Sequence, residues 1–279
     1  MRHRREHGAT GALIALILVL VMVGFLANSA FRRVATGSDE NNETARRLSA
    51  GADALEQFAA VNGRLPCPAD PATNDGGERI RSANIAKCNF PAGTIPWRTL
   101  GMKFDDAIDS WGRKISYRVY TGTSSTGSLT QPGGVNMVEC DTSDPGAGDA
   151  TAVAPNGRGG LCVSDPDPLL RSTLDASFFA GKGMPLNDFG AFHGDVAYVL
   201  FSHGATGLGG YTVSGAILNL PSGDERNNVR NTGPFTIRAF SDPDVAADDS
   251  NHFDDLLVYR TLPDLVKRIN LSARDWPES

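Results

Sequence analysis

Residues 8–31 read G-A-T-G-A-L-I-A-L-I-L-V-L-V-M-V-G-F-L-A-N-S-A-F, and this run contains no charged side chain. The basic segment M-R-H-R-R-E-H precedes it at residues 1–7, and Arg32 and Arg33 follow it. About 20 consecutive apolar residues are enough for a helix to cross a bilayer core. Basic residues on the short side favour a cytoplasmic N-terminus. The sequence therefore predicts a transmembrane helix over residues 9–31.

A cleaved secretory signal peptide is the alternative interpretation of the same run. Ala27-Asn28-Ser29 has the small-x-small pattern of a signal-peptidase site. The apolar core of a signal peptide is usually about 7–15 residues long, and the longer run here favours a retained anchor. The predicted localisation is the inner membrane, with a single span, a cytoplasmic N-terminus and a periplasmic C-terminal domain.

Charge divides sharply after the apolar run. The chain has 279 residues and a formal net charge of −6. Residues 1–33 carry five arginines and one glutamate, so they contribute +4 and the remaining residues contribute −10. We expect no nucleic-acid partner, because phosphate binding needs a concentrated basic surface. The proportions of 41% hydrophobic and 21% charged residues are those of a folded chain.

A second helical pattern occupies residues 44–61. Its apolar residues recur at spacings of three and four, which places them on one helix face. These residues are Leu48, Ala52, Leu55 and Ala59. Gly63 is a good residue to end the helix, with Pro66 just beyond it. We expect residues 32–62 to continue the N-terminal helix and a globular domain to follow over residues 63–279.

The remainder of the chain predicts a small sheet with long loops. Alternation over residues 115–119 predicts a half-buried strand, and the apolar run 195–202 predicts a central one. Further strands are expected at 211–220, 235–240 and 256–259. Residues 261–270 predict a short helix capped by Thr261. Residues 122–190 are expected to form a long loop insertion.

Four cysteines are present, at Cys67, Cys88, Cys140 and Cys162. None belongs to a Cys-x-x-Cys pair, which argues against a zinc ribbon or a thioredoxin-like site. An even number of cysteines in a domain outside the cytoplasm predicts disulfides. Three connectivities are possible, and the ease of closing local loops favours Cys67 with Cys88 and Cys140 with Cys162.

The order of these parts resembles the type IV pilin and type II secretion pseudopilin family. Several segments carry the resemblance beyond the basic leader, which ends in Gly8, and the apolar helix. They are GRLPCP at 63–68, IPWRTLG at 95–101, DSWG at 109–112, SHGATG at 202–207, DERNN at 224–228 and FDDLL at 253–257. The resemblance implies an α+β, pilin-like fold. In that fold a long N-terminal helix, transmembrane and then amphipathic, packs on a small, mainly antiparallel sheet with large loops.

The resemblance also implies processing and partners. A prepilin peptidase would cut after Gly8 and methylate Ala9, and other pilin or pseudopilin subunits would pack through the N-terminal helix in the inner membrane or the filament. The family usually has Phe at the first mature position and Glu at the fifth, whereas Ala9 and Leu13 stand here. That Glu normally meets a neighbour's amino group. A minor, tip or priming subunit of a type II secretion or type IV pilus filament therefore fits better than a main-shaft subunit.

An acidic segment near the C-terminus is a candidate calcium site. Six aspartates lie between residues 242 and 255, with no Lys or Arg among them. Hard oxygen ligands in a flexible loop suit Ca²⁺, and the resemblance implies a calcium loop in this region. The candidate ligands are Asp248, Asp249, Asp254 and Asp255. The spacing is not that of an EF-hand, and a solvated acidic loop is the alternative interpretation.

Enzymatic readings find little support in the sequence. Ser202 and His203, or His193 near Asp195, suggest a hydrolase, but no Gly-x-Ser-x-Gly elbow is present. Adjacent residues on a strand also point to opposite faces. We expect a non-enzymatic protein. Two alternatives stay open: a membrane-anchored periplasmic binding or adhesion protein that uses loops 122–190, and a secreted or anchored periplasmic hydrolase.

Overall fold

The structure is a computed structural model that describes residues 39–82, 87–123, 127–136, 178–242 and 244–270. The chain divides into two units, Met1–Glu43 and Thr44–Ser279, and, apart from residues 39–43 at the start of the first helix, the fold described below lies in the second unit. The predicted transmembrane segment 9–31 lies outside the described residues.

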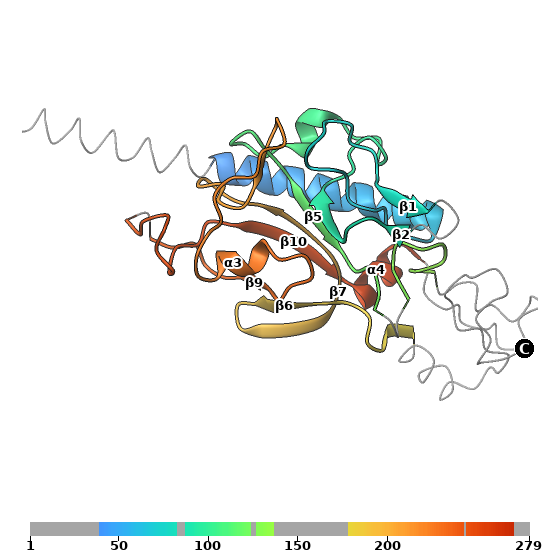
Figure 1. Cartoon of the computed structure of the whole chain (residues 1–279). Helices are drawn as coiled ribbons and strands as arrows, with labels where there is room; N and C mark the ends of the chain where they lie inside the picture. The colour runs from blue at the N-terminus through green and yellow to red at the C-terminus, as the bar shows by residue number, and fades with distance from the viewer. Residues whose placement is uncertain (1–38, 83–86, 124–126, 137–177, 243, 271–279) are drawn as a thin grey trace, which may run out of the picture. The chain divides into compact units, whose positions relative to one another are not determined.

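A helix over residues 39–62 supplies one layer of the fold (Figure 1). The four residues of its predicted apolar face are at most 1% exposed: Leu48, Ala52, Leu55 and Ala59. The amphipathic pattern is therefore confirmed. Gly51 lets the helix approach the sheet, because a Cβ built there would lie 2.8 Å from Cδ1 of Ile95. Gly63 ends the helix at φ +62° and donates its N–H to the Ala59 carbonyl at 2.8 Å.

Strand β7 (Ala191–Ser202) is the centre of the main sheet. Along one edge it pairs with β10 (Leu256–Thr261). Along its length it also pairs with β6 (Met184–Asp188) and β5 (Ser116–Val119). Residues 196–202 of β7 are all buried, because the strand is covered on both faces. The predicted central strand is confirmed. A strand at 115–119 is confirmed as well, but residues 116–119 are all buried, so the half-buried pattern expected there is wrong.

Two outer strands complete the six-stranded sheet. Strand β3 (Ala92–Thr94) pairs with β5, and β9 (Phe235–Ile237) pairs with β6. Outside it, β1 (Ile80–Ser82) pairs with β2 (Lys87–Cys88), and β4 (Arg113–Lys114) pairs with β8 (Tyr211–Thr212). Short helices join these strands: η1 (Phe104–Ala107), α3 (Glu225–Asn228) and α4 (Leu262–Arg268).

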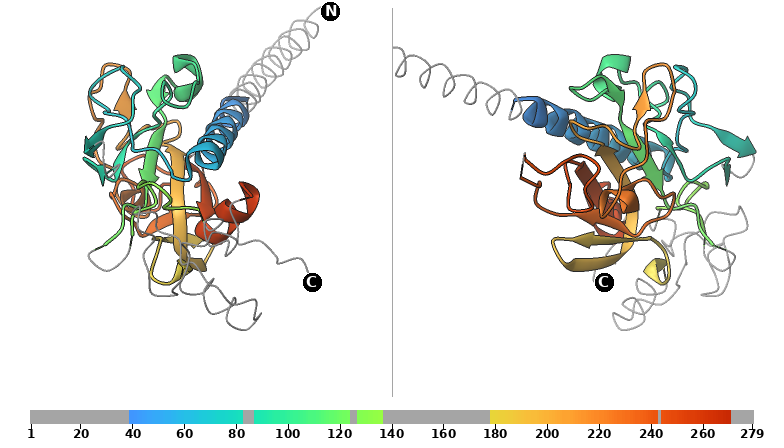
Figure 2. Two further views of the ribbon diagram at one scale, coloured as in Figure 1. Left: turned by 90° about the vertical axis from the view of Figure 1, so that its right-hand side faces the viewer. Right: turned by 60° about the vertical axis from the view of Figure 1, so that its left-hand side comes forward.

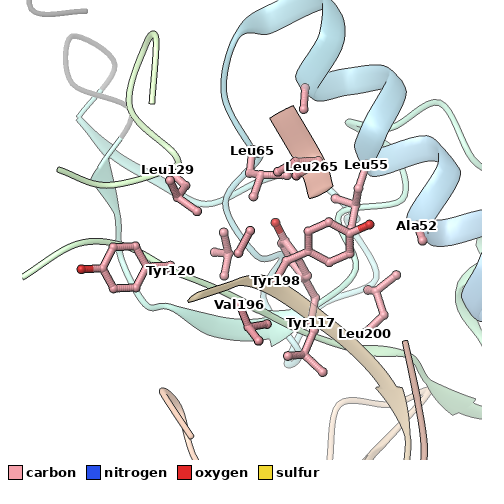
Figure 3. Close-up of a cluster of buried hydrophobic side chains, with 14 of the residues drawn as sticks. Ala52, Leu55, Leu65, Tyr117, Tyr120, Leu129, Val196, Tyr198, Leu200 and Leu265 are labelled. Carbon is pink, nitrogen blue, oxygen red and sulfur yellow. The ribbon is translucent and has the colours of Figure 1, made fainter. Parts of the chain in front are cut away.

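The core lies between the helix over 39–62 and the sheet (Figure 3). Tyr117 and Tyr198 meet edge to face there, with ring centroids 6.4 Å apart. At the rim, Arg260 of β10 donates from Nε to Oε1 of Glu56 at 2.7 Å, which ties the sheet to the helix. Thr261 caps α4 as predicted, because its hydroxyl accepts from the Asp264 N–H.

The expected fold class is wrong on two points. The prediction was an α+β, pilin-like fold with a long N-terminal helix on a small, mainly antiparallel sheet. In the part of the chain that the structure describes, the first helix begins only at residue 39, and α3 and α4 have four and seven residues. The sheet is mixed, because β9 runs parallel to β6. Asn228 holds β9 in place, since its side chain accepts from the Thr236 N–H and donates to the Thr236 carbonyl.

The predicted localisation is corrected as well. None of the helices within the described ranges combines the length and the apolar character that a bilayer crossing requires. The single-pass inner-membrane placement, with a cytoplasmic N-terminus and a periplasmic C-terminal domain, is withdrawn on this finding.

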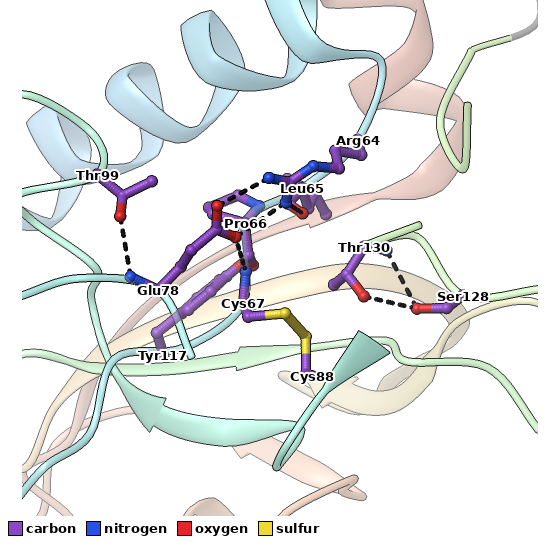
Figure 4. Close-up of a disulfide and its surroundings, with 10 residues drawn as sticks. All are labelled: Arg64, Leu65, Pro66, Cys67, Glu78, Cys88, Thr99, Tyr117, Ser128 and Thr130. Carbon is purple, nitrogen blue, oxygen red and sulfur yellow. Dashed lines mark hydrogen bonds and ion pairs between the residues drawn. A yellow bond between two sulfur atoms is a disulfide. The ribbon is translucent and has the colours of Figure 1, made fainter. Parts of the chain in front are cut away.

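The first predicted disulfide is confirmed (Figure 4). Cys67 and Cys88 are bonded, with Cα atoms 5.3 Å apart. The loop between them is also held by Glu78, which accepts from both terminal nitrogens of Arg64 and from the Cys67 N–H. Cys140 and Cys162 lie outside the described residues.

Candidate functional site

Polar side chains from four loops meet at the C-terminal end of β7. We call these residues the polar loop cluster: Asp109, Ser202, His203, Glu225, Asn228, His252, Asp254 and Asp255. The turn after β7, helix α3, the segment before β10 and the turn before β4 bring them together. Most of the segments that carry the family resemblance contribute to it.

Asp109 organises one side of the cluster. Its Oδ1 accepts from the N–H groups of Trp111 and Arg113, at 3.0 and 2.8 Å, and so closes the turn that opens β4. Its Oδ2 accepts from the Ser202 hydroxyl at 2.7 Å. Arg113 continues this network, because its guanidinium donates to the carbonyls of Gly204 and Ala205. The end of β7 is thereby fixed to the start of β4.

His203 and Asp255 form the buried centre of the cluster. Both side chains are 1% exposed, and Nδ1 of His203 lies 3.5 Å from Oδ1 of Asp255. The other oxygen of Asp255 accepts from Nδ2 of Asn228 at 2.7 Å. The His203 ring stacks edge to face on Phe201. This centre joins β7, α3 and the entry to β10.

Glu225, His252 and Asp254 form the third part of the cluster, and each offers an atom within 4.8 Å of the others. Oε1 of Glu225 accepts from the Asp254 N–H at 2.7 Å. Nε2 of His252 lies 3.6 Å from Oδ2 of Asp254 and 4.0 Å from Oε1 of Glu225, and it makes no hydrogen bond. Two carboxylates and an imidazole are donors of a divalent-metal site.

Burial, and after it the nearby carboxylates of Asp255 and Asp254, together raise the pKa of Glu225 to about 8. Desolvation and like charge both disfavour the ionised form of a carboxyl group. Glu225 is therefore mostly protonated at neutral pH, and any cation that binds there must displace this proton.

The structure places only one of the four predicted calcium ligands in this group. Asp254 belongs to it, but both of its carboxylate oxygens accept from Thr206. Asp255 faces Asn228 and His203. The carboxylate of Asp249 accepts from the Asn251 N–H, and the backbone carbonyl of Asp248 accepts from the Ser222 hydroxyl. Calcium takes six to eight oxygen ligands. A donor set that contains an imidazole nitrogen and a protonated Glu225 fits calcium poorly.

Sequence reasoning missed Glu225 and His252. In the sequence, the DERNN segment at 224–228 points only to the family resemblance, and no local spacing links it to His252. The one signal in the sequence that could have found Glu225 is its carboxylate, because carboxylate oxygens are the ligands that hard cations prefer.

The predicted hydrolase residues do not form a triad. Ser202 donates to Asp109, while His203 faces Asp255 and has its Nε2 3.5 Å from the Ser116 hydroxyl. His193 lies elsewhere, 3.2 Å from the hydroxyl of Tyr259. A nucleophile must hydrogen bond to its base for activation, and Ser202 has no such contact with a histidine within the described ranges. The processing residues Gly8 and Ala9 lie outside those ranges.

Comparison of the chain with protein-family models, with curated proteins and with solved structures gives no match. The geometry of the cluster and the sequence resemblance are therefore the grounds for a functional assignment.

Proposed function

We propose that this chain works by assembly, as a non-enzymatic pilin-like or pseudopilin-like subunit of a type II secretion or type IV pilus filament. The departures at Ala9 and Leu13 favour a minor, tip or priming role. Prepilin peptidase and other subunits of the filament are the proposed partners.

One observation carries the proposal: hydroxyl, amide and carboxylate side chains of the resembling segments hydrogen-bond to one another inside the fold. The Ser202 hydroxyl donates a hydrogen bond to Asp109. Asn228 bonds both to Asp255 and to Thr236 of β9, and Thr206 donates to Asp254. Buried polar groups that bond one another hold loops in a fixed arrangement. This use of the segments supports a scaffold that presents a surface, and it speaks against a hydrolase.

The experiment is mass spectrometry of the N-terminus after coexpression of the full chain with a prepilin peptidase. The proposal expects a chain that begins at N-methylated Ala9. The variant Gly8→Asp should keep its leader, because it replaces the small residue ahead of the cut. A chain that begins near Ala30 would favour the secreted alternative, and an intact Met1 in the presence of active peptidase would remove the assembly proposal.

A further inference from the structure

The loop between β6 and β7 exposes two aromatic residues where a hairpin normally has polar ones. Asp188 pairs with Ala191, so Phe189 and Gly190 form a two-residue turn. Phe189 has φ +48° and is 69% exposed, and Phe192 is 73% exposed. Such turns favour Asn-Gly because both positions need positive φ. A phenylalanine here is unfavourable for the turn and contributes nothing to the core, which points to a role outside its own chain.

This tip is held in one conformation. The Phe189 N–H donates to the Ile237 carbonyl of β9, and the Gly190 N–H donates to Oδ1 of Asn187, both at 2.9 Å. Below the turn, the Tyr259 hydroxyl donates to Oδ2 of Asp188, also at 2.9 Å. A rigid tip loses little conformational entropy when it binds, so its aromatic side chains are ready to act as anchors.

A cavity of about 230 Å³ opens elsewhere in the same unit, between the chain after Cys67 and the start of β3. Its lining combines apolar or aromatic residues, Pro68, Pro71, Phe90, Ala92 and Tyr211, with the polar residues Asp70, Arg79 and Asn231. An apolar cavity of about 150 Å³ is enough to hold benzene, so a phenylalanine ring has room here. Phe90 is 63% exposed at this site, which extends the apolar surface outward.

The tip of a given chain is far from its own cavity. Ala92 of β3 pairs with Arg118 of β5, and Arg118 pairs in turn with Val199 of β7. Val199 is seven residues along β7 from Phe192, roughly 20 Å at about 3.3 Å per residue. Figures 1 and 2 accordingly draw the β6–β7 turn away from β1 and β2. The cavity can receive a tip of this kind only from a second copy.

Charges beside the two surfaces, outside the cavity lining itself, are opposite in sign. Asp188 and Asp195 are partly exposed on the tip strands. Asp70 and Arg79 both line the cavity and form an ion pair at 2.8 Å, which leaves the lining itself neutral, and Arg81 is exposed on the adjoining strand β1. Opposite charges at the rim of an apolar contact steer the partners and fix their register.

We propose that Phe189 of one copy, with Phe192 beside it, inserts into this cavity of the next copy. The contact uses different surfaces on the two copies, and such a contact between a few copies of a tip or priming subunit closes into a ring where the rotation between copies allows it. The inference rests on the proposed assembly function and names one interface of it.

Pairwise cross-linking of the full chain tests this contact. Phe189→Cys and Phe90→Cys are made in separate, differently tagged copies that also carry Cys140→Ser and Cys162→Ser. A short bismaleimide should join the two variants when they are mixed and should leave each variant alone monomeric. A chain that carries both cysteines should give a ladder of products. Dimers from Phe189→Cys alone would indicate tip-to-tip contact, and no mixed product at all would also overturn the proposal.

A second measurement separates a lost contact from a lost fold. Phe189→Ser combined with Phe192→Ser should weaken self-association at least tenfold in sedimentation, with an unchanged circular-dichroism spectrum. Val61→Ser is the control, because Val61 is an exposed apolar residue, 84% exposed, that belongs to the helix over 39–62 and neither to the tip nor to the cavity lining. Equal association of both variants would contradict the contact. If the cross-link fails while the chain still begins at methylated Ala9, the interface is wrong and the assembly function stands.

Discussion

The polar loop cluster and the β6–β7 tip invert what their residue types suggest. Ser202, His203 and Asp255 have the chemistry of an active site, yet they are buried inside the fold, where Ser202 donates to Asp109 and Asp255 accepts from Asn228. Phe189 and Phe192 have the chemistry of a core, yet they are the most exposed aromatic side chains among the described residues. Residue type alone therefore predicts the wrong burial for both regions, and the contacts in the structure decide it.

The largest expected effect tests whether the polar loop cluster stabilises the fold. Asp109→Ala should lower the free energy of unfolding by about 3–5 kcal/mol, because the Ser202 hydroxyl and the Arg113 N–H lose a buried charged acceptor. Urea denaturation measures the change. The exposed Asp105→Ala is the control and should stay within about 0.5 kcal/mol of the parent. A similar small effect for Asp109→Ala would show that the cluster does not hold the loops.

The Cys67–Cys88 disulfide gives the second prediction, because it holds the loop that lies beside the cavity. Replacing both Cys67 and Cys88 with Ala should cost about 3 kcal/mol in the chain-entropy model, since it frees a loop of sequence separation 21. The midpoint of urea unfolding reports this loss when parent and variant both carry Cys140→Ser and Cys162→Ser, and the parent in reductant should then match the variant. A loss below about 1 kcal/mol would mean that the Arg64–Glu78 pair already fixes the loop.

Glu225 makes the stability of the cluster depend on pH. Its raised pKa, about 8, means that the folded protein keeps a proton that the unfolded chain loses above its ordinary value of 4.5. Stability should therefore fall as pH rises from about 5 to 8, by about 2 kcal/mol once screening by nearby solvent is allowed for. Thermal unfolding in EDTA measures the slope, and Glu225→Gln should flatten it. An unchanged slope in that variant would place the titrating group elsewhere.

The smallest expected effect is a gain. Phe189→Gly should raise the free energy of unfolding by about 1 kcal/mol, because glycine adopts positive φ without the cost that a Cβ adds. Phe192→Gly in the strand next to it should instead destabilise the protein slightly. Chemical denaturation of the two variants side by side checks the opposite signs. A loss of stability in Phe189→Gly would show that its ring packs on its own chain.

Local patterns predicted the elements that local physics decides. The spacing of Leu48, Ala52, Leu55 and Ala59 gave the buried helix face, and the apolar run before His203 gave the central strand. Thr261 predicted the start of α4, because an N-cap hydroxyl bonds to a backbone N–H within the first turn of the helix. The Cys67–Cys88 bond followed from short loop closure.

Long-range contacts decided the rest. The parallel pairing of β9 depends on Asn228, whose side chain bonds Thr236 in place of a neighbouring strand. Glu225 and His252 join Asp254 from segments that no spacing rule connects. The turn at Phe189 escaped prediction because its residue is the opposite of what a two-residue hairpin favours.

The central claim is that exposed aromatic residues serve assembly while polar ones serve the fold. Its most direct test is the self-association of Phe189→Gly, measured by sedimentation over a range of concentrations beside the parent protein. The account predicts a variant that is more stable than the parent and associates at least tenfold more weakly. Association equal to that of the parent, in a variant of raised stability, would contradict it.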